Sequence, residues 1–583
     1  MISSSLCRPA PGISILLIMC ALLMMSGSTA RAEHRKLVFP IGHTVSAAPE
    51  RVGFCYGGRV GIATASVRKE SERHALVYSF SVPEARIIDD FDLRPDFGLS
   101  KPSKLPLMRV HSETGLVMLF GVDSNGIPKL LALSADQAGL LSKRWMVSFP
   151  AGSLSASLSG LAYNGDGSRI YFIHRYPTSQ SASPGAESAA SLDVLSPADI
   201  AGQREKDASL AEGTVTVQSE VGSPTLHVVL LRSEDGEILA TTELMDAGIT
   251  GETSFNGWLF FDDARNRAVA MAGRLTHVFA PGSDSLEIET SINANHLQVS
   301  DLIGKAISKD GRFAVGFYGY QVGDSSTGGG QMMLVSFDLD LKTARSFTID
   351  SRFTSEANPW TFHRPTDTLL VPLSLTFKRP DEHRIREVRG TSRRSMILVF
   401  SADGTLIKTP VAKLPKRSAH SSEPNVVGSF SSIGVSATGA LGFLSTENGR
   451  VFAFDATSGE IVNDLELKPS GGLSSIHLLD PPGVIVFGRG RDKLMFADVS
   501  TGPIIDAIEV LSTRTIIKGS NFLSGARVQI DGVELNVARR NPDDPGREII
   551  IKRGKRDFPR GQDFTVVVIN RDGVSSKPIT FAR

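Results

Sequence analysis

The sequence predicts an all-β protein, and three features support this prediction. The 583 residues include 55 Gly and 30 Pro, which are the residues that turns between short strands require. A strand-rich segment repeats near the end of the chain at a spacing of 43 residues. The final segment alternates apolar and polar residues with the period of two that is typical of strands.

The composition is that of a globular protein with balanced charge. Hydrophobic residues make up 41% and charged residues 21% of the chain, so a sizeable core is expected. Lys and Arg together number 62, as do Asp and Glu, and the formal net charge is zero. This balance argues against nucleic acid or an anionic membrane as a partner of the whole chain, because phosphate binding needs an excess of basic residues.

The N-terminal residues 1–32 have the pattern of a signal peptide. Arg8 precedes an apolar run at 13–25, and Ala30-Arg31-Ala32 fits a cleavage site, so the mature chain is expected to start near Glu33. The alternative is an uncleaved anchor, but the run is shorter than the roughly 20 residues that span a bilayer. No other stretch is predicted to span a membrane. The protein is therefore expected to be exported, to the periplasm, the cell surface or the extracellular space.

Cysteine usage excludes an intrachain disulfide in the mature chain. Cys7 and Cys20 lie in the predicted signal peptide, so that only Cys55 remains. Cys55 lies in the strand-like run VGFCYGG. A buried and inert thiol is favoured over a catalytic thiolate, which would need a basic and exposed setting.

The repeat near the end of the chain predicts a β-propeller. The segments 437–467 and 481–510 share the turn pattern D-x-[ST]-[ST]-G, at Asp455–Gly459 and at Asp498–Gly502. Their strands are short and apolar on both faces, as in buried sheets. A period in the low forties with three to four strands is typical of a propeller blade. Ordinary hairpins of another all-β fold are the alternative.

Weaker copies of this unit lie upstream, with turns at Asp166-Gly167 and Asp310-Gly311. A strand near 37–45 is a candidate to close the ring by pairing with the last blade, which would remove an exposed sheet edge. The predicted units lie near 51–95, 104–150, 155–246, 253–290, 302–349, 356–410, 428–467 and 472–510.

The repeated pattern resembles the YVTN-type, or WD-repeat-like, β-propellers over roughly residues 37–510. Members of that family usually have seven blades, whereas eight units are found here, so a seven- or an eight-bladed propeller over 33–510 is predicted. Mobile insertions are expected near 178–213, 323–330 and 378–395. The last is basic, and it is interpreted as a solvated loop, with an anionic-ligand or cell-surface contact as the alternative.

The segment 511–583 predicts a small C-terminal β-sandwich. Val528 and Ile530 fall on one face of a strand and Gln529 on the other. The segment resembles the IPT/TIG family of immunoglobulin-like domains at Gly519, Phe522, Gly525, Val528, Asp531-Gly532, Val566, Val568, Asn570 and Gly573.

The IPT/TIG resemblance implies a spacer or adhesive module in an exported protein. A related domain contacts DNA in transcription factors, but the export signal favours a solvated loop for the basic run 552–560. The module is expected to pack on the last blade or to hold the propeller off a surface.

No motif assigns a catalytic, cofactor-binding or metal-ligating residue, and no cofactor is predicted. The chain lacks the G-x-S-x-G, P-loop, C-x-x-C-H, H-E-x-x-H and calcium-loop patterns. Four histidines lie beside predicted blade strands and are candidates for a metal site at the central channel, but separate hydrogen-bonded histidines are favoured: His111, His174, His363 and His477. The acidic stretch 87–96 is a candidate cation site, but a solvated turn between blades is favoured; its carboxylates are Asp89, Asp90, Asp92 and Asp96.

Two functions remain open from the sequence. The favoured one is an exported, non-enzymatic binding or scaffold protein that contacts a protein, a glycan or the cell envelope, and no nucleic acid. The alternative is a propeller enzyme of the lactonase or quinoprotein-dehydrogenase kind, with a metal or cofactor at the central channel. The propeller resemblance fixes the fold far better than the function, because such rings carry many unrelated activities.

Overall fold

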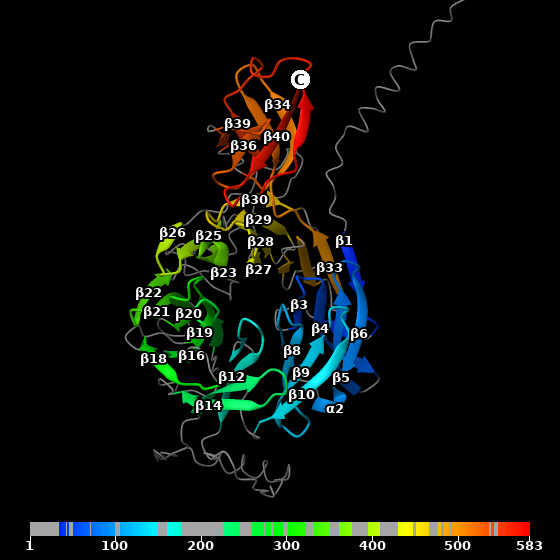
Figure 1. Ribbon diagram of the computed structural model, residues 1–583, viewed down its shortest axis with the longest axis vertical. Helices are drawn as coiled ribbons and strands as arrows, with labels where there is room; N and C mark the ends of the chain where they lie inside the picture. Colours follow the sequence, from blue (N-terminus) through cyan, green and yellow to red (C-terminus); the bar gives the residue numbers. More distant parts are fainter. Residues whose placement is uncertain are drawn as a thin grey trace, which may run out of the picture.

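The chain is a β-propeller with a two-sheet sandwich at its rim (Figure 1). This is a computed structural model of the full chain. It describes residues 34–41, 43–45, 51–69, 72–98, 105–149, 160–176, 225–244, 258–272, 275–280, 284–294, 301–321, 330–349, 361–375, 394–408, 430–446, 450–465, 476–479, 483–488, 492–535, 538–541 and 546–583.

The first four sheets of the ring are antiparallel and follow one another along the chain. The first contains β2 (His43–Val45), β3 (Val52–Cys55), β4 (Val60–Lys69), β5 (Glu72–Ser81) and β6 (Arg86–Asp92), followed by the short helix α2 (Arg94–Phe97). The next three contain β7 (Leu107–Val110), β8 (Leu116–Val122), β9 (Pro128–Ala135) and β10 (Leu141–Ser148); β11 (Leu161–Tyr163), β12 (Arg169–Tyr176), β13 (Thr225–Arg232) and β14 (Ile238–Leu244); and β15 (Trp258–Asp262), β16 (Arg267–Ala272), β17 (Leu275–Phe279) and β18 (Ile288–Asn293).

The fifth to eighth sheets complete the ring. The fifth and sixth contain β19 (Asp301–Ile307), β20 (Phe313–Gln321), β21 (Gly330–Asp338) and β22 (Thr343–Ile349); and β23 (Thr361–His363), the 3₁₀ turn η3 (Arg364–Thr366), β24 (Thr368–Leu375), β25 (Arg394–Ser401) and β26 (Leu406–Lys408). The seventh and eighth contain β27 (Phe430–Val435), β28 (Leu441–Thr446), β29 (Val451–Asp455) and β30 (Ile461–Asp464); and β31 (Ile476–Leu479), β32 (Val484–Gly488), β33 (Lys493–Asp498) and β1 (His34–Val38).

The N-terminal strand closes the ring. β1 pairs with β33 along its whole length, from His34 opposite Ala497 to Val38 opposite Lys493. The predicted strand at 37–45 is therefore split, because His43–Val45 forms β2 and pairs with β4 in the first sheet. The described residues form eight such sheets, which confirms the propeller and decides between seven and eight blades.

The predicted boundary between ring and tail at residue 510 is wrong. The strand β34 (Ile504–Val510) pairs with β35 (Thr515–Ser520) of the sandwich and not with β33. The physical reason is that β1 already occupies the free edge of β33. The second copy of the 43-residue repeat therefore holds for its first strands only, and its last strand belongs to the tail.

Short turns join the strands where the sequence predicts them. Gly167 and Gly311 adopt positive φ angles of 71° and 69°. A side chain at Gly311 would lie 2.0 Å from a carboxylate oxygen of Asp262 in the neighbouring sheet, so this turn requires glycine for space as well as conformation.

The core of the ring is divided into clusters that lie between neighbouring sheets. One cluster joins the eighth and first sheets, with Leu37, Phe80 and Phe496 buried together. Another joins the seventh and eighth sheets through Phe443 and Phe487. Burial of each such side chain contributes roughly 1.5–3 kcal/mol, so neighbouring sheets hold one another in a rigid ring.

The tail consists of two four-stranded sheets that share one core. Val528 and Ile530 point into this core as predicted, together with Phe558 and Phe564. One sheet contains β34, β35, β38 (Ala538–Arg540) and β39 (Glu548–Ile551), and the other contains β36 (Arg527–Ile530), β37 (Val533–Leu535), β40 (Asp563–Ile569) and β41 (Ile579–Ala582).

The sandwich is docked on the seventh sheet. Leu523 is fully buried within the cluster of the seventh and eighth sheets. The backbone N–H of Ser524 donates to Oδ2 of Asp455 at 3.0 Å, and the N–H of Ala440 donates to Oδ2 of Asp572 at 2.8 Å. The module therefore packs on the propeller, mainly on the seventh sheet rather than the last.

Several predictions lie outside the described residues. These are the signal peptide at 1–32, the insertion at 178–213, and those at 323–330 and 378–395 apart from the strand ends that begin β21 and β25. In the part of the chain that the structure describes, no helix has the length and apolar character needed to cross a membrane.

Candidate functional site

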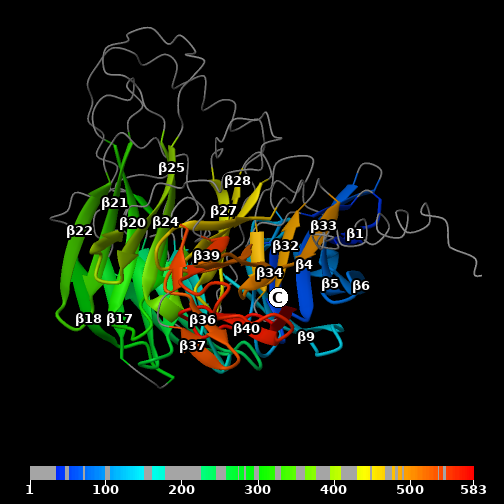
Figure 2. The same ribbon diagram turned by 90° about the horizontal axis from the view of Figure 1, so that it is seen from above.

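One face of the ring carries short turns between successive strands of a sheet, such as those from β19 to β20 and from β21 to β22. We call it the hairpin face. The pairing of Phe313 with Asp338 marks this end of β20 and β21, whereas the pairing of Gln321 with Gly330 marks the opposite end. Figure 2, which views the ring from the side, shows these strands standing side by side with β25. The strand ends that flank the predicted insertions, such as Gln321 and Gly330, therefore lie on the opposite face.

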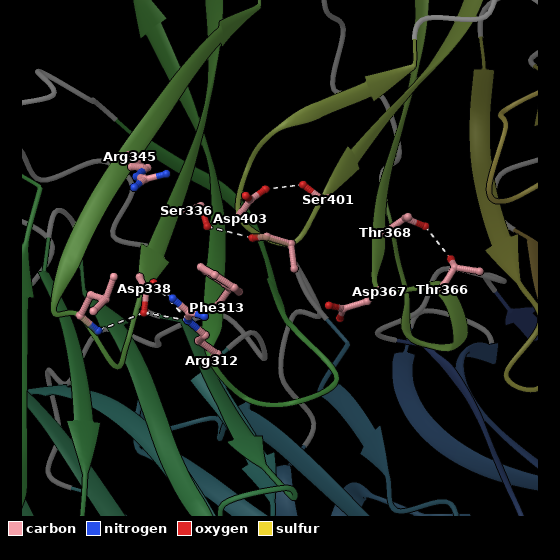
Figure 3. Close-up of a pocket in the computed structure, with 12 residues that line it drawn as sticks. Arg312, Phe313, Ser336, Asp338, Arg345, Thr366, Asp367, Thr368, Ser401 and Asp403 are labelled. Carbon is pink, nitrogen blue, oxygen red and sulfur yellow. Dashed lines mark hydrogen bonds and ion pairs between the residues drawn. The ribbon is translucent and has the colours of Figure 1, made fainter.

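A cavity of about 500 Å³ lies on the hairpin face between the fifth and sixth sheets. We call it the groove (Figure 3). Its walls come from turns of both sheets, so that no single hairpin forms it. It is lined by Arg312, Phe313, Ser336, Asp338, Leu341, Arg345, Thr366, Asp367, Thr368, Ser401, Ala402 and Asp403.

An ion pair forms one wall of the groove. The guanidinium of Arg312 donates to Oδ2 of Asp338 from Nη2 at 2.8 Å and from Nε at 3.2 Å, and it lies 4.8 Å from the ring centre of Phe313. Oδ1 of Asp338 accepts the backbone N–H groups of Asp340 and Leu341 at 3.1 and 3.0 Å. Burial opposes ionisation, but Arg312 and these N–H groups hold the pKa of Asp338 below its usual range.

The opposite wall carries Asp403. Its Oδ1 accepts hydrogen bonds from the hydroxyl of Ser401 and from the backbone N–H of Thr405, the latter at 2.9 Å. Burial again opposes ionisation, but these bonds and the nearby Arg345 guanidinium lower the pKa of Asp403. Arg345 itself is exposed and has no hydrogen bond or ion pair to another side chain in the described residues.

Hydrogen bonds between the two sheets fix the floor of the groove. The hydroxyl of Ser336 donates to the carbonyl of Ala402 at 2.9 Å. The backbone N–H of Lys309 donates to Oδ1 of Asp367 at 2.8 Å. Because each bond joins the fifth sheet to the sixth, the walls keep a fixed separation.

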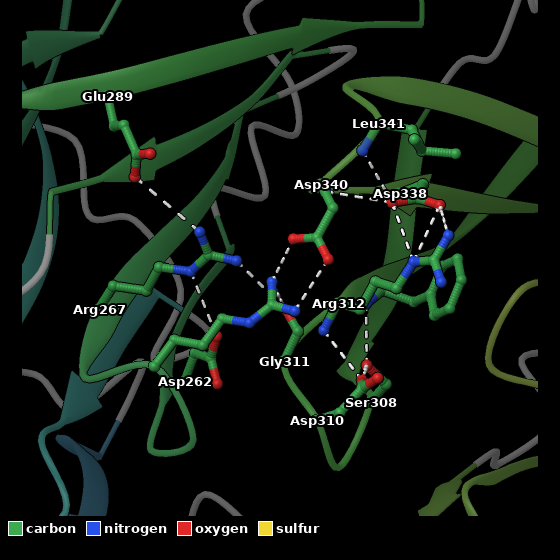
Figure 4. A network of polar contacts seen from close by, with 12 residues as sticks. Asp262, Arg267, Glu289, Ser308, Asp310, Gly311, Arg312, Asp338, Asp340 and Leu341 are labelled. Carbon is green, nitrogen blue, oxygen red and sulfur yellow. Dashed lines mark hydrogen bonds and ion pairs between the residues drawn. The ribbon is translucent and has the colours of Figure 1, made fainter.

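A charge network supports the groove from the fourth sheet (Figure 4). Arg265 donates to both carboxylate oxygens of Asp340, at 2.5 and 3.0 Å. Arg267 pairs with Asp262 at 3.3 Å and donates to the carbonyl of Gly311 at the same distance. Arginines of the fourth sheet therefore hold the two turns of the fifth sheet that carry Gly311 and Asp340, next to Arg312 and Asp338.

The two wall carboxylates of the groove are ionised at neutral pH. General acid–base catalysis works best with a pKa near the operating pH, whereas Asp338 and Asp403 have lowered pKa values and stay ionised at neutral pH. The hydroxyls of Thr366 and Thr368 bond each other at 2.7 Å. What remains available at the mouth is the guanidinium of Arg345 and the side chain of Leu341, which is 60% exposed.

The four candidate histidines come from four different sheets, and the structure does not bring them together. His111 is buried against Tyr163, and His477 lies 5.4 Å from Phe54, measured between ring centres. His174 lies on β12, opposite His227.

His363 is fully buried and has a structural role. Its Nε2 lies 2.6 Å from the carbonyl oxygen of Gly439 in the seventh sheet, and a carbonyl accepts only, so Nε2 carries the proton. Nδ1 then accepts the hydroxyl of Thr366 at 2.5 Å. Burial lowers the pKa of His363, which keeps the ring neutral.

The acidic candidates tie the first sheet to the second. Oδ2 of Asp89 accepts the N–H of Leu141 at 2.8 Å, and Asp96 pairs with Lys143 on the same strand, β10. Oδ1 of Asp89 accepts the N–H of Asp90, and Asp92 accepts Nε of Arg94 at 2.7 Å. These oxygens already have partners and do not form a cation site.

The described residues contain no group of three or more His, Cys, Asp or Glu placed to hold a metal ion. Cys55 is buried, and burial raises the pKa of its thiol to about 12. It is therefore the inert thiol that its apolar setting predicts.

The groove residues were not predicted as a site. The sequence identifies Asp310-Gly311 as a turn, and it assigns no site residue in this region of the chain. Asp403 lies in a similar Asp-Gly turn. The available signal was that aspartates begin turns in two successive units, but the sequence does not say which turns face each other.

Comparisons with known proteins do not assign a family. No protein-family model matches the chain, and no curated protein matches it. Among solved structures, the Dos1 propeller is 9% identical with a TM-score of 0.46, over 79% of this chain and 94% of that chain. Sqt1 of Chaetomium thermophilum is 12% identical with a TM-score of 0.44, over 80% and 99%. Hydrazine synthase of Kuenenia stuttgartiensis is 11% identical with a TM-score of 0.36, over 64% and 90%. The propeller assignment rests on the sheet order and ring closure of this chain.

Proposed function

We propose that this protein is an exported, non-enzymatic binding protein whose groove holds a segment of a protein partner. The observation that carries this proposal is the groove itself, a cavity of about 500 Å³ with hydrogen-bonded walls and floor. Its volume lies in the range typical of ligand pockets. Its rigidity means that binding costs little ordering of the receptor.

The chemistry at the mouth defines a complementary segment. Arg345 offers a planar, exposed guanidinium that suits a carboxylate, and Leu341 offers an exposed apolar side chain. A partner segment with an acidic residue near an apolar one complements both. Asp338 and Asp403 line the walls and disfavour a purely acidic ligand, which adds specificity to the attraction.

The tail and the export signal extend this proposal. The IPT/TIG-like residues and the two-sheet fold support a spacer module of that family, held on the ring by Leu523 and Asp455. The pattern at residues 1–32 supports export to the periplasm, cell surface or extracellular space. Mass spectrometry of the protein from its source cells tests export, with Glu33 as the expected first residue. A mature chain that still begins at Met1 would reject it.

A charge and polarity reversal in the groove tests the binding function. The double variant Leu341→Asp/Arg345→Glu should lose the partner that the wild type captures from an envelope extract, measured by quantitative mass spectrometry. Direct titration of that purified partner should show affinity lowered by about tenfold or more, because a charged pair is replaced by repulsion.

The second sheet offers a matched control. Leu140 is 55% exposed in the equivalent hairpin, and the exposed Arg144 follows four residues later, as Arg345 follows Leu341. Leu140→Asp/Arg144→Glu should keep the partner. Retention of the partner by the groove variant, or its loss from both variants at unchanged melting temperature, would reject the groove as the binding site.

A further inference from the structure

The far end of the sandwich carries a compact group of basic residues. We call Lys552, Arg553, Lys555, Arg556 and Arg560 the basic tip. They precede β40, which begins at Asp563, and the turn after β40 contacts the ring through Asp572. The basic tip therefore lies at the opposite end of the sandwich from the ring. The C-terminal residue Arg583 bonds this loop, and Figure 1 shows the C-terminus at the end away from the ring.

The charges of the basic tip are not neutralised. All five side chains are exposed, and none forms an ion pair with another described residue. Two acidic residues lie nearby: Asp557 in the same loop and Asp563 at the start of β40. Oδ2 of Asp557 already accepts the N–H of Gly554 at 2.8 Å. Five cations against two carboxylates leave a net positive surface, although the whole chain has no net charge.

The loop that presents these cations is held in place. Phe558 is buried in the sandwich core, with its ring centre 5.0 Å from that of Phe564 and 5.5 Å from that of Phe581. The N–H of Lys555 donates to the carbonyl of Leu511 at 2.9 Å. The carbonyls of the loop accept further bonds: that of Arg553 from Thr515 at 2.7 Å and that of Phe558 from Arg583 at 2.7 Å.

These bonds use the backbone and leave the cationic side chains available. The basic tip is therefore a preformed surface, and a ligand does not have to order it. Substitution of the cations leaves the bonds that hold the loop intact.

We propose that the basic tip binds an anionic polysaccharide. Several cations in one rigid loop match a chain that repeats carboxylate, sulfate or phosphate groups, and release of its counterions favours association. Single-stranded nucleic acid is favoured by exposed aromatic rings on which bases stack, and membranes by apolar side chains that insert. The aromatic ring of this loop, that of Phe558, is buried instead. Charge without an exposed ring fits a hydrophilic polyanion.

This inference goes beyond the proposed groove function and is independent of it in location. The groove lies between the fifth and sixth sheets, whereas the basic tip lies at the far end of the tail. The two surfaces would allow the protein to hold a partner while it is attached to an anionic glycan. Both proposals assume that the protein is exported, and mass spectrometry of the mature N-terminus tests export separately.

Binding of the full mature chain to dextran sulfate tests the proposal. Neutral dextran of the same length is the control ligand, and fluorescence anisotropy is the measurement. We expect binding to dextran sulfate only, with an affinity that falls steeply between about 50 and 200 mM salt. The variant K552Q/R553Q/K555Q/R556Q should bind at least about tenfold more weakly, because four cation contacts are lost. The smaller variant R556Q/R560Q provides a second test if the larger one has a lowered melting temperature.

A matched control removes four exposed cations elsewhere: Arg144, Lys342, Arg571 and Lys577. Their replacement by Gln should change the affinity less than about twofold if binding is local to the basic tip. Equal losses in both variants would overturn the proposal. So would tip-dependent binding to duplex DNA or to phosphatidylserine vesicles without binding to dextran sulfate. The groove variant Leu341→Asp/Arg345→Glu should keep its affinity for dextran sulfate, so failure of either proposal is recognised separately.

Discussion

The hairpin face is built in the same way at two places and is used differently at each. Between the fifth and sixth sheets the turns leave the groove open. On the seventh sheet similar turns are covered by the sandwich, where the N–H of Ser524 reaches Oδ2 of Asp455. Asp338 and Asp455 both cap their own turns through Oδ1. They differ in the second oxygen, which Arg312 occupies in the groove and the tail occupies at the seventh sheet.

This difference shows how a propeller face acquires a partner. A turn aspartate needs only one carboxylate oxygen to cap its own backbone. Its second oxygen is therefore available to a side chain or a backbone N–H that packs on the turn. At the seventh sheet the tail also approaches with its backbone, since a side chain at Gly546 would lie 2.1 Å from the carbonyl oxygen of Val462. The groove lacks that backbone contact in the described residues and keeps an exposed arginine, Arg345, at its mouth.

The largest expected effect comes from breaking the covered region. Leu523 is fully buried between the tail and the ring, so Leu523→Ala should lower the free energy of unfolding by about 2–5 kcal/mol through lost burial and a cavity. Denaturant unfolding measures it. Val533→Ala on the same sandwich is the control, because Val533 is 61% exposed and its truncation should cost less than about 0.5 kcal/mol. Similar losses in the two variants would mean that the tail does not dock through Leu523.

The second prediction compares the loss of stability at two turn aspartates, Asp455 under the tail and Asp403 in the groove. Asp455→Ala removes a turn cap and leaves the N–H of Ser524 without its partner, for a loss of about 2–3 kcal/mol. Asp403→Ala in the groove removes bonds within its own turn, from the N–H of Thr405 and the hydroxyl of Ser401, and should cost about 1 kcal/mol. Unfolding of both variants under one set of conditions gives the difference. If Asp403→Ala cost as much as Asp455→Ala, the contact with the tail would contribute nothing.

The sequence predicted the strands of the ring more accurately than the long-range contacts that close the ring and attach the tail. The repeat at 437–467 and 481–510 identified blades because each blade repeats a local pattern of strands and turns. It misplaced β34, because strand order alone does not show that β1 has taken the edge of β33. That pairing joins residues more than 450 positions apart, and no local pattern encodes it.

The groove was out of reach of sequence reasoning for the same reason. Asp338 and Asp403 each show the signature of a turn, but their common cavity depends on how two sheets pack. The sequence shows no ligand spacing around His363, and its bond to the Gly439 carbonyl likewise depends on how two sheets pack. Docking of the tail on the seventh sheet depends on Leu523, which lies between the positions that carry the family resemblance.

A pH effect is expected where the open and covered regions meet. His363 of the sixth sheet bonds Gly439 of the seventh, and burial lowers its pKa below 6.5. Below about pH 6.5 the unfolded chain takes up a proton that the folded chain does not. Stability should therefore fall as the pH decreases toward the folded pKa, by up to about 1.4 kcal/mol per pH unit.

Comparison with His363→Gln isolates this contribution, because the glutamine amide can still donate to the Gly439 carbonyl and does not titrate. The variant should lose stability less steeply between about pH 7.5 and 5.5 in urea unfolding. His43 and His227 also have pKa values lowered by burial, but they are present in both chains and cancel in the difference. Parallel curves for the two chains would show that His363 is not a neutral buried group.

The smallest effect is expected at the edge of the covered region. Arg540 of the tail pairs with Glu460 of the seventh sheet at 2.9 Å, with side chains that are 18% and 39% exposed. Partly exposed pairs contribute about 0.2–1 kcal/mol, because solvent screens them and both side chains lose freedom. A double-mutant cycle of Arg540→Ala and Glu460→Ala should give a coupling in that range, decreasing with salt. A coupling as large as the loss from Leu523→Ala would mean that charge, rather than apolar burial, fixes the tail on the ring.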